Sequence, residues 1–568
     1  MMCLKKEKAM LRKDCDFQKK VLETDVLVIG AGGAGLRAAI EASRTGARVL
    51  VVAKGDFPSG CTAISMGGML ASFAPNDSKQ IHLQDILSGG DYLNEPHLVK
   101  LLTEYACNRT EDLEKFGTIF RKNDLGYVLF HYTGSSVPRA VVADRPYAGG
   151  FVNGLVEEIG RRGIQVIPRV MIFDLIKKKG AVVGAAGLDL ESDTLLSILA
   201  GSTILATGGA GNLYRLTTNP ADITGDGYAL AYRAGARLQD MEFVQGRVCI
   251  VAPAGMRGTP PPGDGLVTQG GKFYNSLCER FMKYYHPDNL EKVTRAQMSI
   301  CAQKEINKGK HTANKGVYGD LSDVPKEELN RYERFINACA DQNFDPSWQP
   351  YEWAPGVHHF MGGVSINDKC ETGVSGLFAA GEVVGGIHGS NRLGGNALTE
   401  TQVFGAIAGK QAAQRALSLK NSSSLPPNYP EYVEDRLLSI SKREENIDPA
   451  KVREELTGTM SDHVGVIRNE DGLRKASDIL KEIRETKIQK LSPGKDRSFR
   501  TLSELIAVEN LHTVGELVVS AALMRKETRG AHIREDYPKI DNNWQQHIVF
   551  YLKGDLPCFE FVPVDNSP

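Results

Sequence analysis

The chain has 568 residues, of which 42% are hydrophobic, enough for several buried cores in more than one domain. Its 68 basic and 69 acidic residues nearly cancel, which excludes the basic surface typical of nucleic-acid-binding proteins. The 59 glycines are clustered rather than periodic, which excludes a collagen-like chain and indicates tight turns or close contact with a ligand.

The N-terminal segment and the cysteines restrict where the protein works and what it binds. Residues 1–24 are rich in Lys and Arg and contain no apolar run of signal-peptide length. No apolar run in the sequence approaches the length of a membrane span. The ten cysteines are scattered and form no C-x-x-C motif. We expect a cytoplasmic protein without a direct membrane span that carries no metal site, haem or iron–sulfur cluster of its own.

The first predicted element is a buried parallel strand at residues 25–29, because this segment is short, β-branched and apolar on both faces. The glycine-rich segment 30–35 follows it, and apolar spacing predicts a helix over 36–44. A second strand is predicted at 48–52. Together these segments predict a β-turn-α-β unit near the start of the chain.

Within this unit, Gly30, Gly32 and Gly35 form a G-x-G-x-x-G motif. Such glycines make a tight turn, let backbone amides approach a pyrophosphate at the helix N-terminus, and allow the helix to pack closely on the strand. The second strand ordinarily leads to an acid that binds a ribose hydroxyl, but Ala53 and Lys54 stand there. We therefore predict a dinucleotide site whose adenosine end uses Lys54 or backbone groups.

Strands that run into glycines are also predicted at 202–206 and 377–380, so one nucleotide-binding sheet is expected to collect strands from distant parts of the chain. The stretch 246–350, with three consecutive prolines and many Lys and Asn residues, is predicted to be an inserted domain. Beyond the polar linker 421–427, helices are predicted at 431–443, 450–457 and 473–486. The predicted segments are a basic tail at 1–24, the first part of the dinucleotide-binding domain at 25–245, the inserted domain at 246–350, the second part of the dinucleotide-binding domain at 351–420, and a C-terminal helical domain with a tail at 421–568.

Seven segments, in chain order, are similar to motifs of one protein family. They are 59–68, 225–227, 241–245, 357–363, 381–383, 388–398 and 529–538. On these motifs the chain, from about Thr24 to Tyr551, resembles the flavoprotein subunits of succinate dehydrogenases and fumarate reductases. The resemblance implies an α/β fold in which a Rossmann-like FAD-binding domain carries an inserted α+β capping domain and a C-terminal helical domain.

The resemblance implies FAD as the cofactor and assigns its contacts residue by residue. The expected contacts are Gly30, Gly32, Gly35, Lys54, Thr62, Gly67, Gly68, Asp226, Glu382, Ala397 and Leu398. Two of them have alternative interpretations: Asp226 as a turn residue that binds its own backbone, and Glu382 as a cap of the following helix.

One departure from the family concerns how FAD is held. Many family members attach the flavin covalently to a histidine, and this chain has Cys61 at that position. We therefore expect non-covalent FAD, as in soluble members of the family and in the related L-aspartate oxidases. By the same analogy, the absence of the covalent bond favours reduction of the substrate over oxidation.

The resemblance also places a substrate site in the chain. His358 and Arg392 are expected to clamp a carboxylate, because a guanidinium binds it bidentately and an imidazole adds a donor. Arg295 is expected to exchange a proton with the substrate while a hydride passes to or from flavin N5, and Asp264 is the expected proton relay. Each assignment has an alternative. His358 could be a core histidine, and Arg392 could form a buried ion pair without a ligand. Arg295 could be a solvated helix arginine, and Asp264 a plain turn aspartate.

Two further departures concern the substrate. Arg247 stands where the family has a histidine for the second carboxylate, and Gly263 stands where it has a threonine. Phe120 resembles the aromatic residue that packs over the substrate, with a core phenylalanine as the alternative. We call the binding positions for the two ends of the substrate its two poles. The pole formed by His358 and Arg392 is expected to be kept, and the second pole, at Arg247 and Gly263, is expected to be changed. The expected substrate is a small carboxylate, either fumarate-like or another enoate.

The sequence leaves three functions open. The first is an FAD-dependent oxidoreductase of fumarate reductase or succinate dehydrogenase type, which acts on a C=C or CH–CH bond next to a carboxylate. The second is amine oxidation of the L-aspartate oxidase type, and the third is a non-catalytic flavin subunit for electron transfer. By the resemblance, we expect electrons from an iron–sulfur subunit or another donor, and a place at the membrane only through partner subunits.

Overall fold

The computed structural model describes residues 18–564, apart from 66, 133, 145–149, 262–265, 267–268, 294, 331, 420–424, 427–428, 442, 444–446 and 495. Its largest sheet has the strand order β8-β2-β1-β11-β10-β9, and β18 also pairs with β11. These strands are β1 (Gln18–Ile29), β2 (Val49–Val52), β8 (Gln165–Ile167), β9 (Val170–Lys178), β10 (Ala181–Asp189), β11 (Thr194–Leu205) and β18 (Leu377–Ala379). The pairs β8–β2, β2–β1, β1–β11 and β11–β18 are parallel, whereas β9 and β10 add antiparallel pairs.

The first strand is longer than the sequence predicts. It begins at Gln18 rather than at residue 25, and residues 18–24 pair in register with 194–200 of β11. The buried apolar pattern that identifies the strand starts only at Val26, and most of the preceding side chains are exposed. The predicted basic tail is therefore a strand from Gln18 onward, and the strand predicted at 202–206 is the end of β11.

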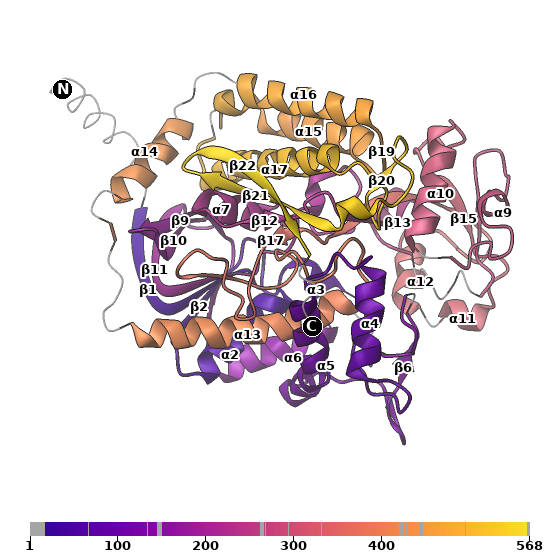
Figure 1. Ribbon diagram of the computed structural model, residues 1–568, viewed down its shortest axis with the longest axis horizontal. Helices are drawn as coiled ribbons and strands as arrows, with labels where there is room; N and C mark the ends of the chain where they lie inside the picture. The colour runs from indigo at the N-terminus through magenta and orange to yellow at the C-terminus, as the bar shows by residue number, and fades with distance from the viewer. Residues whose placement is uncertain are drawn as a thin grey trace.

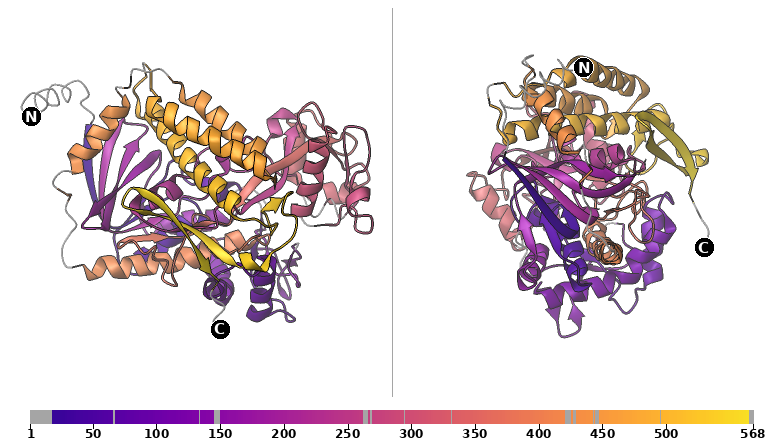
Figure 2. Two further views of the ribbon diagram at one scale, coloured as in Figure 1. Left: turned by 45° about the horizontal axis from the view of Figure 1, so that its top comes forward. Right: turned by 90° about the vertical axis from the view of Figure 1, so that its left-hand side faces the viewer.

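Helices cover both faces of this sheet, and Figure 2 shows the strands between α13 (Asn396–Ser418) on one side and the C-terminal helices on the other. On the first side, α13 packs against α2 (Gly33–Arg44). This contact needs glycine, because a Cβ atom at Gly409 would come within 2.1 Å of the Ala38 carbonyl oxygen. The other elements of this region are α3 (Gly60–Ile64), β3 (Met69–Leu70), α4 (Lys79–Gly89), α5 (Pro96–Phe116), β4 (Lys122–Asn123), β5 (Gly126–Tyr127), β6 (Leu129–Phe130), β7 (Ala140–Val141) and α6 (Gly150–Arg161).

A second sheet lies at the right of Figure 1 and has the order β13-β16-β15-β14, with antiparallel pairs throughout. Its strands are β13 (Val244–Ala252), β14 (Lys272–Tyr274), β15 (Val317–Asp320) and β16 (Tyr351–Phe360), and its helices are α9 (Met282–Tyr285), α10 (Arg295–Asn307), α11 (Lys326–Asn330) and α12 (Glu333–Ala340). A separate apolar core around Phe273, Phe281 and Trp353 holds these elements together. This region corresponds to the predicted inserted segment, whose boundaries stay a prediction.

The C-terminal part contains the three predicted helices, α14 (Tyr429–Ser441), α15 (Pro449–His463) and α16 (Glu470–Thr486). It also contains α17 (Phe499–Met524), which the sequence pattern did not reveal because this helix is buried on most sides and lacks a one-sided apolar stripe. The predicted tail is in fact a hairpin of β21 (Gln546–Lys553) and β22 (Leu556–Pro563). The hairpin forms a third sheet with β12 (Leu238–Gln239) and β17 (Gly363–Val364).

Among the described residues, α17 is the one helix whose length and composition would allow it to cross a membrane. Most of its apolar stretch is buried inside the protein, and the helix packs on α7 (Asp226–Ala234), α15 and α16. Such burial is typical of a core helix, so its composition is weak support for a membrane span.

Candidate active site

A cleft opens where β1, β2 and β11 end, and its empty space of about 820 Å³ includes its open side. Parallel strands place such clefts at their carboxyl ends, where helix N-termini also point. Six of the eleven predicted cofactor contacts line the cleft. They are Gly30, Gly32, Lys54, Thr62, Asp226 and Glu382.

The three motif glycines have different roles in the structure. Gly30 has a φ of +116°, and a Cβ atom there would come within 2.1 Å of the Ala206 carbonyl oxygen. A Cβ atom at Gly35 would come within 1.9 Å of the Gly30 carbonyl oxygen, so Gly35 allows α2 to pack on the end of β1. Gly32 precedes the first residue of α2 and is less crowded, since a Cβ atom there would lie 3.7 Å from the Ser59 carbonyl oxygen. Gly32, Gly33 and Ala34 at this helix start line the cleft, and the backbone amides of a helix N-terminus suit a pyrophosphate.

Lys54 and Asp226 form an ion pair beside the cleft. The Lys54 Nζ atom lies 2.9 Å from Oδ2 of Asp226 and donates to the Thr224 hydroxyl at 2.5 Å. The other Asp226 oxygen accepts a hydrogen bond from Asn510 at 2.8 Å. Asp226 is the first residue of α7 and uses side-chain partners, which argues against its role as a turn residue that binds its own backbone.

Cys61 and Thr62 lie on the short helix α3 at the wall of the cleft. Burial raises the pKa of the Cys61 thiol well above its usual value, and the carboxylates of Glu382 and Asp222 raise it further. The thiol is therefore protonated at neutral pH and is a weak nucleophile. Thr62 is buried against the start of α2, where a Cβ atom at Gly33 would lie 2.9 Å from its hydroxyl oxygen.

Two polar side chains support the assignment of the cleft to FAD. The Thr207 hydroxyl lines the cleft and is buried without a hydrogen-bond partner among the described residues. The Glu382 carboxylate accepts a hydrogen bond from the Phe360 amide at 3.1 Å, and burial raises its pKa to about 7. Hydroxyl groups of a ribityl or ribose chain would give both side chains partners. The next described helix, α13, begins only at Asn396, so Glu382 does not cap a helix that follows it directly.

The remaining predicted cofactor contacts lie around the start of α13. The Gly68 amide donates to the Tyr132 hydroxyl at 3.0 Å, and a Cβ atom at Gly395 would come within 2.9 Å of the Gly68 carbonyl oxygen. A Cβ atom at Gly67 would lie 3.8 Å from a methyl group of Leu398. The structure therefore brings Gly67, Gly68, Ala397 and Leu398 into one region. Thr401, one turn further along α13, lines the cleft itself.

His358 and Arg392 each have a polar side-chain partner. His358 is on β16, and its Nδ1 atom lies 2.7 Å from the Thr218 hydroxyl. Arg392 is 7% exposed, and its Nη2 atom donates to Oε1 of Gln245 at 3.1 Å. The amide nitrogen of Gln245 donates in turn to Asn391 Oδ1 and to the Arg392 carbonyl oxygen, each at 2.9 Å. Gln245 thus fixes both the backbone and the guanidinium of Arg392.

Arg392 also lies close enough to the cofactor cleft for its charge to act there. Burial lowers the pKa of His359 well below its usual value, and the charge of Arg392 lowers it further. The same charge opposes part of the rise that burial causes in the pKa of Glu382, which lines the cleft. The charge of the predicted carboxylate-binding arginine therefore reaches a residue of the predicted flavin site.

Arg247 lies on β13, opposite Gly356 of β16, and Gly246 lies opposite Val357. The two strands carry a bulge between Gln245 and Gly246, next to His358. Pairing of β13 with β16 thus places Arg247 within two residues of His358 across the sheet. The role of Arg247 at the second pole of the substrate site stays a prediction.

The other predicted substrate residues are less closely tied to the site. Arg295 is the first residue of α10, which packs on β13 and β16, but its side chain is outside the described part of the chain. Asp264 and Gly263 also lie outside the described residues. Phe120 is 4% exposed and packs between the rings of Tyr127 and Phe151, with centroids 5.8 and 5.6 Å away. These contacts favour the alternative of a core phenylalanine.

Sequence reasoning missed three polar groups around these residues: Gln245, Thr218 and His359. Gln245 belongs to the conspicuous segment 241–245, so a signal was present, but no role followed from it. Thr218 contacts His358 across 140 positions of the chain, and nothing in the local pattern predicts such a contact.

Comparisons with known proteins show which family the chain resembles. The sequence matches the family model described as an FAD-binding domain over residues 25–398, and the one described as the fumarate reductase flavoprotein C-terminus over 453–568. An uncharacterized FAD-dependent oxidoreductase of Methanocaldococcus jannaschii is 40% identical over 95% of this chain and 98% of its own. One subunit of the fumarate reductase (CoM/CoB) of Methanothermobacter marburgensis is 38% identical over 94% of this chain and 98% of its own. The structure of Sdh1 of Mycobacterium smegmatis with UQ1 has 32% identity and a TM-score of 0.88, covering 97% of this chain and 95% of that one.

Proposed function

Because the chain belongs to the family of fumarate reductase and succinate dehydrogenase flavoproteins, we propose that it is an FAD-dependent catalytic subunit that reduces a C=C bond next to a carboxylate, or oxidises the saturated product. One observation carries the assignment of the reacting site. The charge of Arg392, whose guanidinium is held by Gln245, acts on Glu382, a residue that lines the dinucleotide cleft. A substrate carboxylate at Arg392 would therefore be next to the cofactor.

When bound, FAD supplies or accepts the hydride in such a reaction. Arg392 and His358 hold one carboxylate of the substrate, and the positive charge of Arg392 stabilises negative charge that develops on it. Thr218 orients the His358 ring through Nδ1, and Nε2 is the atom assigned to the substrate. The second pole is assigned to Arg247, whose guanidinium suits an anionic or polar group.

The proton in this proposal passes through Arg295 at the start of α10. An arginine alone is a weak acid, because its pKa is far above neutral, so it needs a carboxylate that passes protons onward. Asp264 is the proposed relay. In the sequence, both residues lie between β13 and β16, so their proposed approach to Arg392 depends on how this inserted segment sits over the cleft.

Electrons for the reaction have to come from outside this chain, because its sequence has no motif for a haem or an iron–sulfur cluster. We place an iron–sulfur subunit, or another small electron donor, beside the flavin end of the site, and any attachment to a membrane in the partner subunits. The FAD is held without a covalent bond, since Cys61 stands at the position of the attachment histidine and the pKa of its thiol is raised well above its usual value.

An anaerobic assay with a reduced viologen dye tests the proposal. We expect dye oxidation that depends on fumarate or on another enoate and that is lost in Arg392→Ala. Oxidation of L-aspartate, with no enoate turnover, would support the amine-oxidising alternative and contradict the proposal. A chain that binds FAD but turns over neither class of compound would be an electron-transfer subunit instead.

A further inference from the structure

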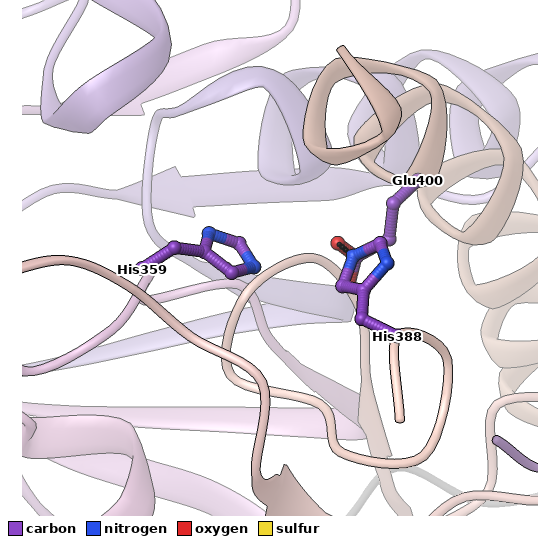
Figure 3. A group of neighbouring side chains, drawn as sticks. All are labelled: His359, His388 and Glu400. Carbon is purple, nitrogen blue, oxygen red and sulfur yellow. Dashed lines mark hydrogen bonds and ion pairs between the residues drawn. The ribbon is translucent and has the colours of Figure 1, made fainter. Parts of the chain in front are cut away.

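Three buried side chains come together behind the proposed carboxylate-binding residues. His359 comes from β16, His388 from the loop that leads to Arg392, and Glu400 from the first turns of α13 (Figure 3). One ligand atom from each lies within 4.8 Å of the others, and the residues are 4%, 3% and 1% exposed. We propose that this group, the His–His–Glu site, binds one divalent transition-metal ion, with Zn²⁺ as the best match.

The separation of two of the three ligand atoms fits a common ion. Nε2 of His388 lies 2.9 Å from Oε2 of Glu400. Two atoms at this separation can each lie about 2.1 Å from one zinc ion, with an angle of about 90° between the two bonds. The same separation also fits a hydrogen bond, so the other atoms of the group decide between the two interpretations.

Each member of the group has a buried polar atom with no hydrogen-bond partner among the described residues. These atoms are Nε2 of His359, Nδ1 of His388 and Oε1 of Glu400. Figure 3 shows the His359 ring turned toward His388 and Glu400. Buried polar groups without partners are rare, because their desolvation is not compensated. An ion among the three side chains would give the His359 nitrogen and the second Glu400 oxygen a partner.

The surroundings of His359 favour the same interpretation. Its Nδ1 atom lies 3.6 Å from Oε1 of Glu382, so Nε2 is the nitrogen left for an ion. Histidine ligands commonly face a carboxylate with their second nitrogen, which sets the orientation of the ring. Two imidazoles and one carboxylate are a ligand set typical of zinc with a fourth position for water. The carboxylates of Glu400 and Glu382 would compensate the charge of the ion, whereas the guanidinium of Arg392 adds positive charge nearby.

The sequence predicted no metal site, because His359, His388 and Glu400 are far apart in the chain and form no spaced motif. The fold brings together three segments that also carry proposed site residues: His358 precedes His359, Arg392 follows His388 by four positions, and Leu398 precedes Glu400 by two. An ion here would fix these segments relative to one another. The inference concerns metal content and position, so its test does not depend on which substrate the protein uses.

Metal analysis of the full-length, untagged protein tests the proposal. The protein is purified without chelators from cells grown with added zinc, and its metals are measured by inductively coupled plasma mass spectrometry. We expect close to one zinc ion per chain. His359→Gln and Glu400→Gln should each lower zinc retention at least about tenfold, because each removes one ligand. The matched control is His512→Gln, which replaces another buried histidine, one bonded to the Leu480 carbonyl oxygen, and should keep the ion.

Two results would overturn the proposal. One is a folded wild-type protein that contains no zinc or similar metal and takes up none from ZnCl₂ in equilibrium dialysis. The other is full zinc content in folded His359→Gln and Glu400→Gln, which would place the metal elsewhere. If these variants do not fold, wild-type protein loaded with Co²⁺ decides: ligand-field bands beyond the flavin absorption support a histidine-rich site, and their absence in cobalt-exposed protein contradicts it.

Discussion

The Nζ atom of Lys54 lies 2.9 Å from Oδ2 of Asp226, and this ion pair joins the end of β2 to the start of α7 at the dinucleotide cleft. The second strand of a dinucleotide-binding unit ordinarily provides an acid at this place. Here the strand leads to a lysine, and the acid comes from α7, more than 170 positions later in the chain. The carboxylate is therefore present at the cleft, but another element supplies it.

Removal of either partner should weaken FAD binding. Lys54→Met leaves the Asp226 carboxylate with only neutral partners, and Asp226→Asn removes the charge that positions Lys54. A hydrogen bond to a charged group contributes about 1.5–3 kcal/mol, so the dissociation constant for FAD should rise by about 10- to 100-fold in each variant. Fluorescence titration of apoprotein with FAD measures the change.

Lys79→Met is the control for this prediction, because it breaks an exposed ion pair with Glu104. Its FAD affinity should equal that of the wild type, since exposed pairs contribute little. Wild-type affinity in both Lys54→Met and Asp226→Asn would show that the pair stabilises the fold without contacting the cofactor.

The fold could be predicted from the sequence where burial leaves a pattern. The segments 25–29 and 48–52 are short apolar runs beside glycines, and both are strands of the central sheet. The exposed start of β1 lacks such a run, so its pairing depends on residues of β11 that are distant in sequence. The helix α17 is hidden for the opposite reason, since it is apolar on nearly all sides. The strand β21 does contain an apolar run at 548–552, which lies within the segment predicted as a tail.

The candidate site, like the fold, could be predicted from the sequence only in part. Motifs within one segment, such as Gly30 to Gly35, predict the cleft, because the chemistry is local. Phe120 resembles a substrate-packing aromatic residue in sequence, with a core phenylalanine as the alternative, and its ring packs between Tyr127 and Phe151. The hydrogen bond from Arg392 to Gln245 spans 147 positions, and only the fold brings these residues together. Contacts of this kind cannot be read from a single sequence without its structure.

The FAD should be released when the protein is denatured. Cys61 occupies the position of the attachment histidine, and burial keeps its thiol protonated. Acid precipitation should therefore leave all yellow flavin in the supernatant. Flavin fluorescence that stays on the protein band of a denaturing gel would show a covalent bond, and Cys61→Ser would then identify whether Cys61 forms it.

The attachment of the C-terminal hairpin should weaken as the pH rises. Burial alone would lower the pKa of His547, but the Asp240 carboxylate, 2.5 Å from Nδ1, together with Glu95 raises it above 6.5. A raised pKa in the folded state means that the stabilisation is complete below pH 6.5 and is lost as the pH passes the folded-state pKa. Thermal unfolding from about pH 5.5 to about pH 9 measures this.

The comparison for His547 is with His547→Gln, which keeps a donor for Asp240 without a titrating group. The melting temperature of the wild type should exceed that of this variant most at the acidic end of the range, and the difference should shrink as the pH rises. A difference that is constant across this range would assign the role of His547 to packing or neutral hydrogen bonding.

Arg295→Lys should reduce catalysis without reducing FAD content. The proposed role of Arg295 is to deliver a proton in the transition state, and lysine lacks the planar guanidinium and places its charge differently. We expect kcat to fall by at least about 10³-fold, which corresponds to about 4 kcal/mol. The control is Lys304→Met on the same helix α10, which should keep kcat. Near-normal turnover in Arg295→Lys would exclude Arg295 from the chemical step.

The last prediction concerns substrate choice and follows from the two poles of the site. Arg392 is fixed by Gln245, so the pole for the shared carboxylate is intact, whereas Arg247 stands on β13 at the second pole in place of a histidine. A substrate that leaves buried polar groups unpaired loses about 1–3 kcal/mol of binding. Arg247 and Gly263 change the shape and the donors of this pole, so fumarate and succinate are predicted to be weaker substrates than an enoate with one carboxylate and a different, polar second substituent that pairs with Arg247.

Variants at the two poles should respond differently in a panel of fumarate, methyl- and aryl-substituted enoates and their saturated forms. Arg392→Ala should abolish turnover of every member, because all share the carboxylate that Arg392 binds. Arg247→Ala should change the order of kcat/KM values, because only the second substituent differs among the members. If fumarate is the best substrate, and Arg247→Ala lowers all values equally, then Arg247 simply replaces the histidine, and the second pole binds a carboxylate as in an ordinary fumarate reductase.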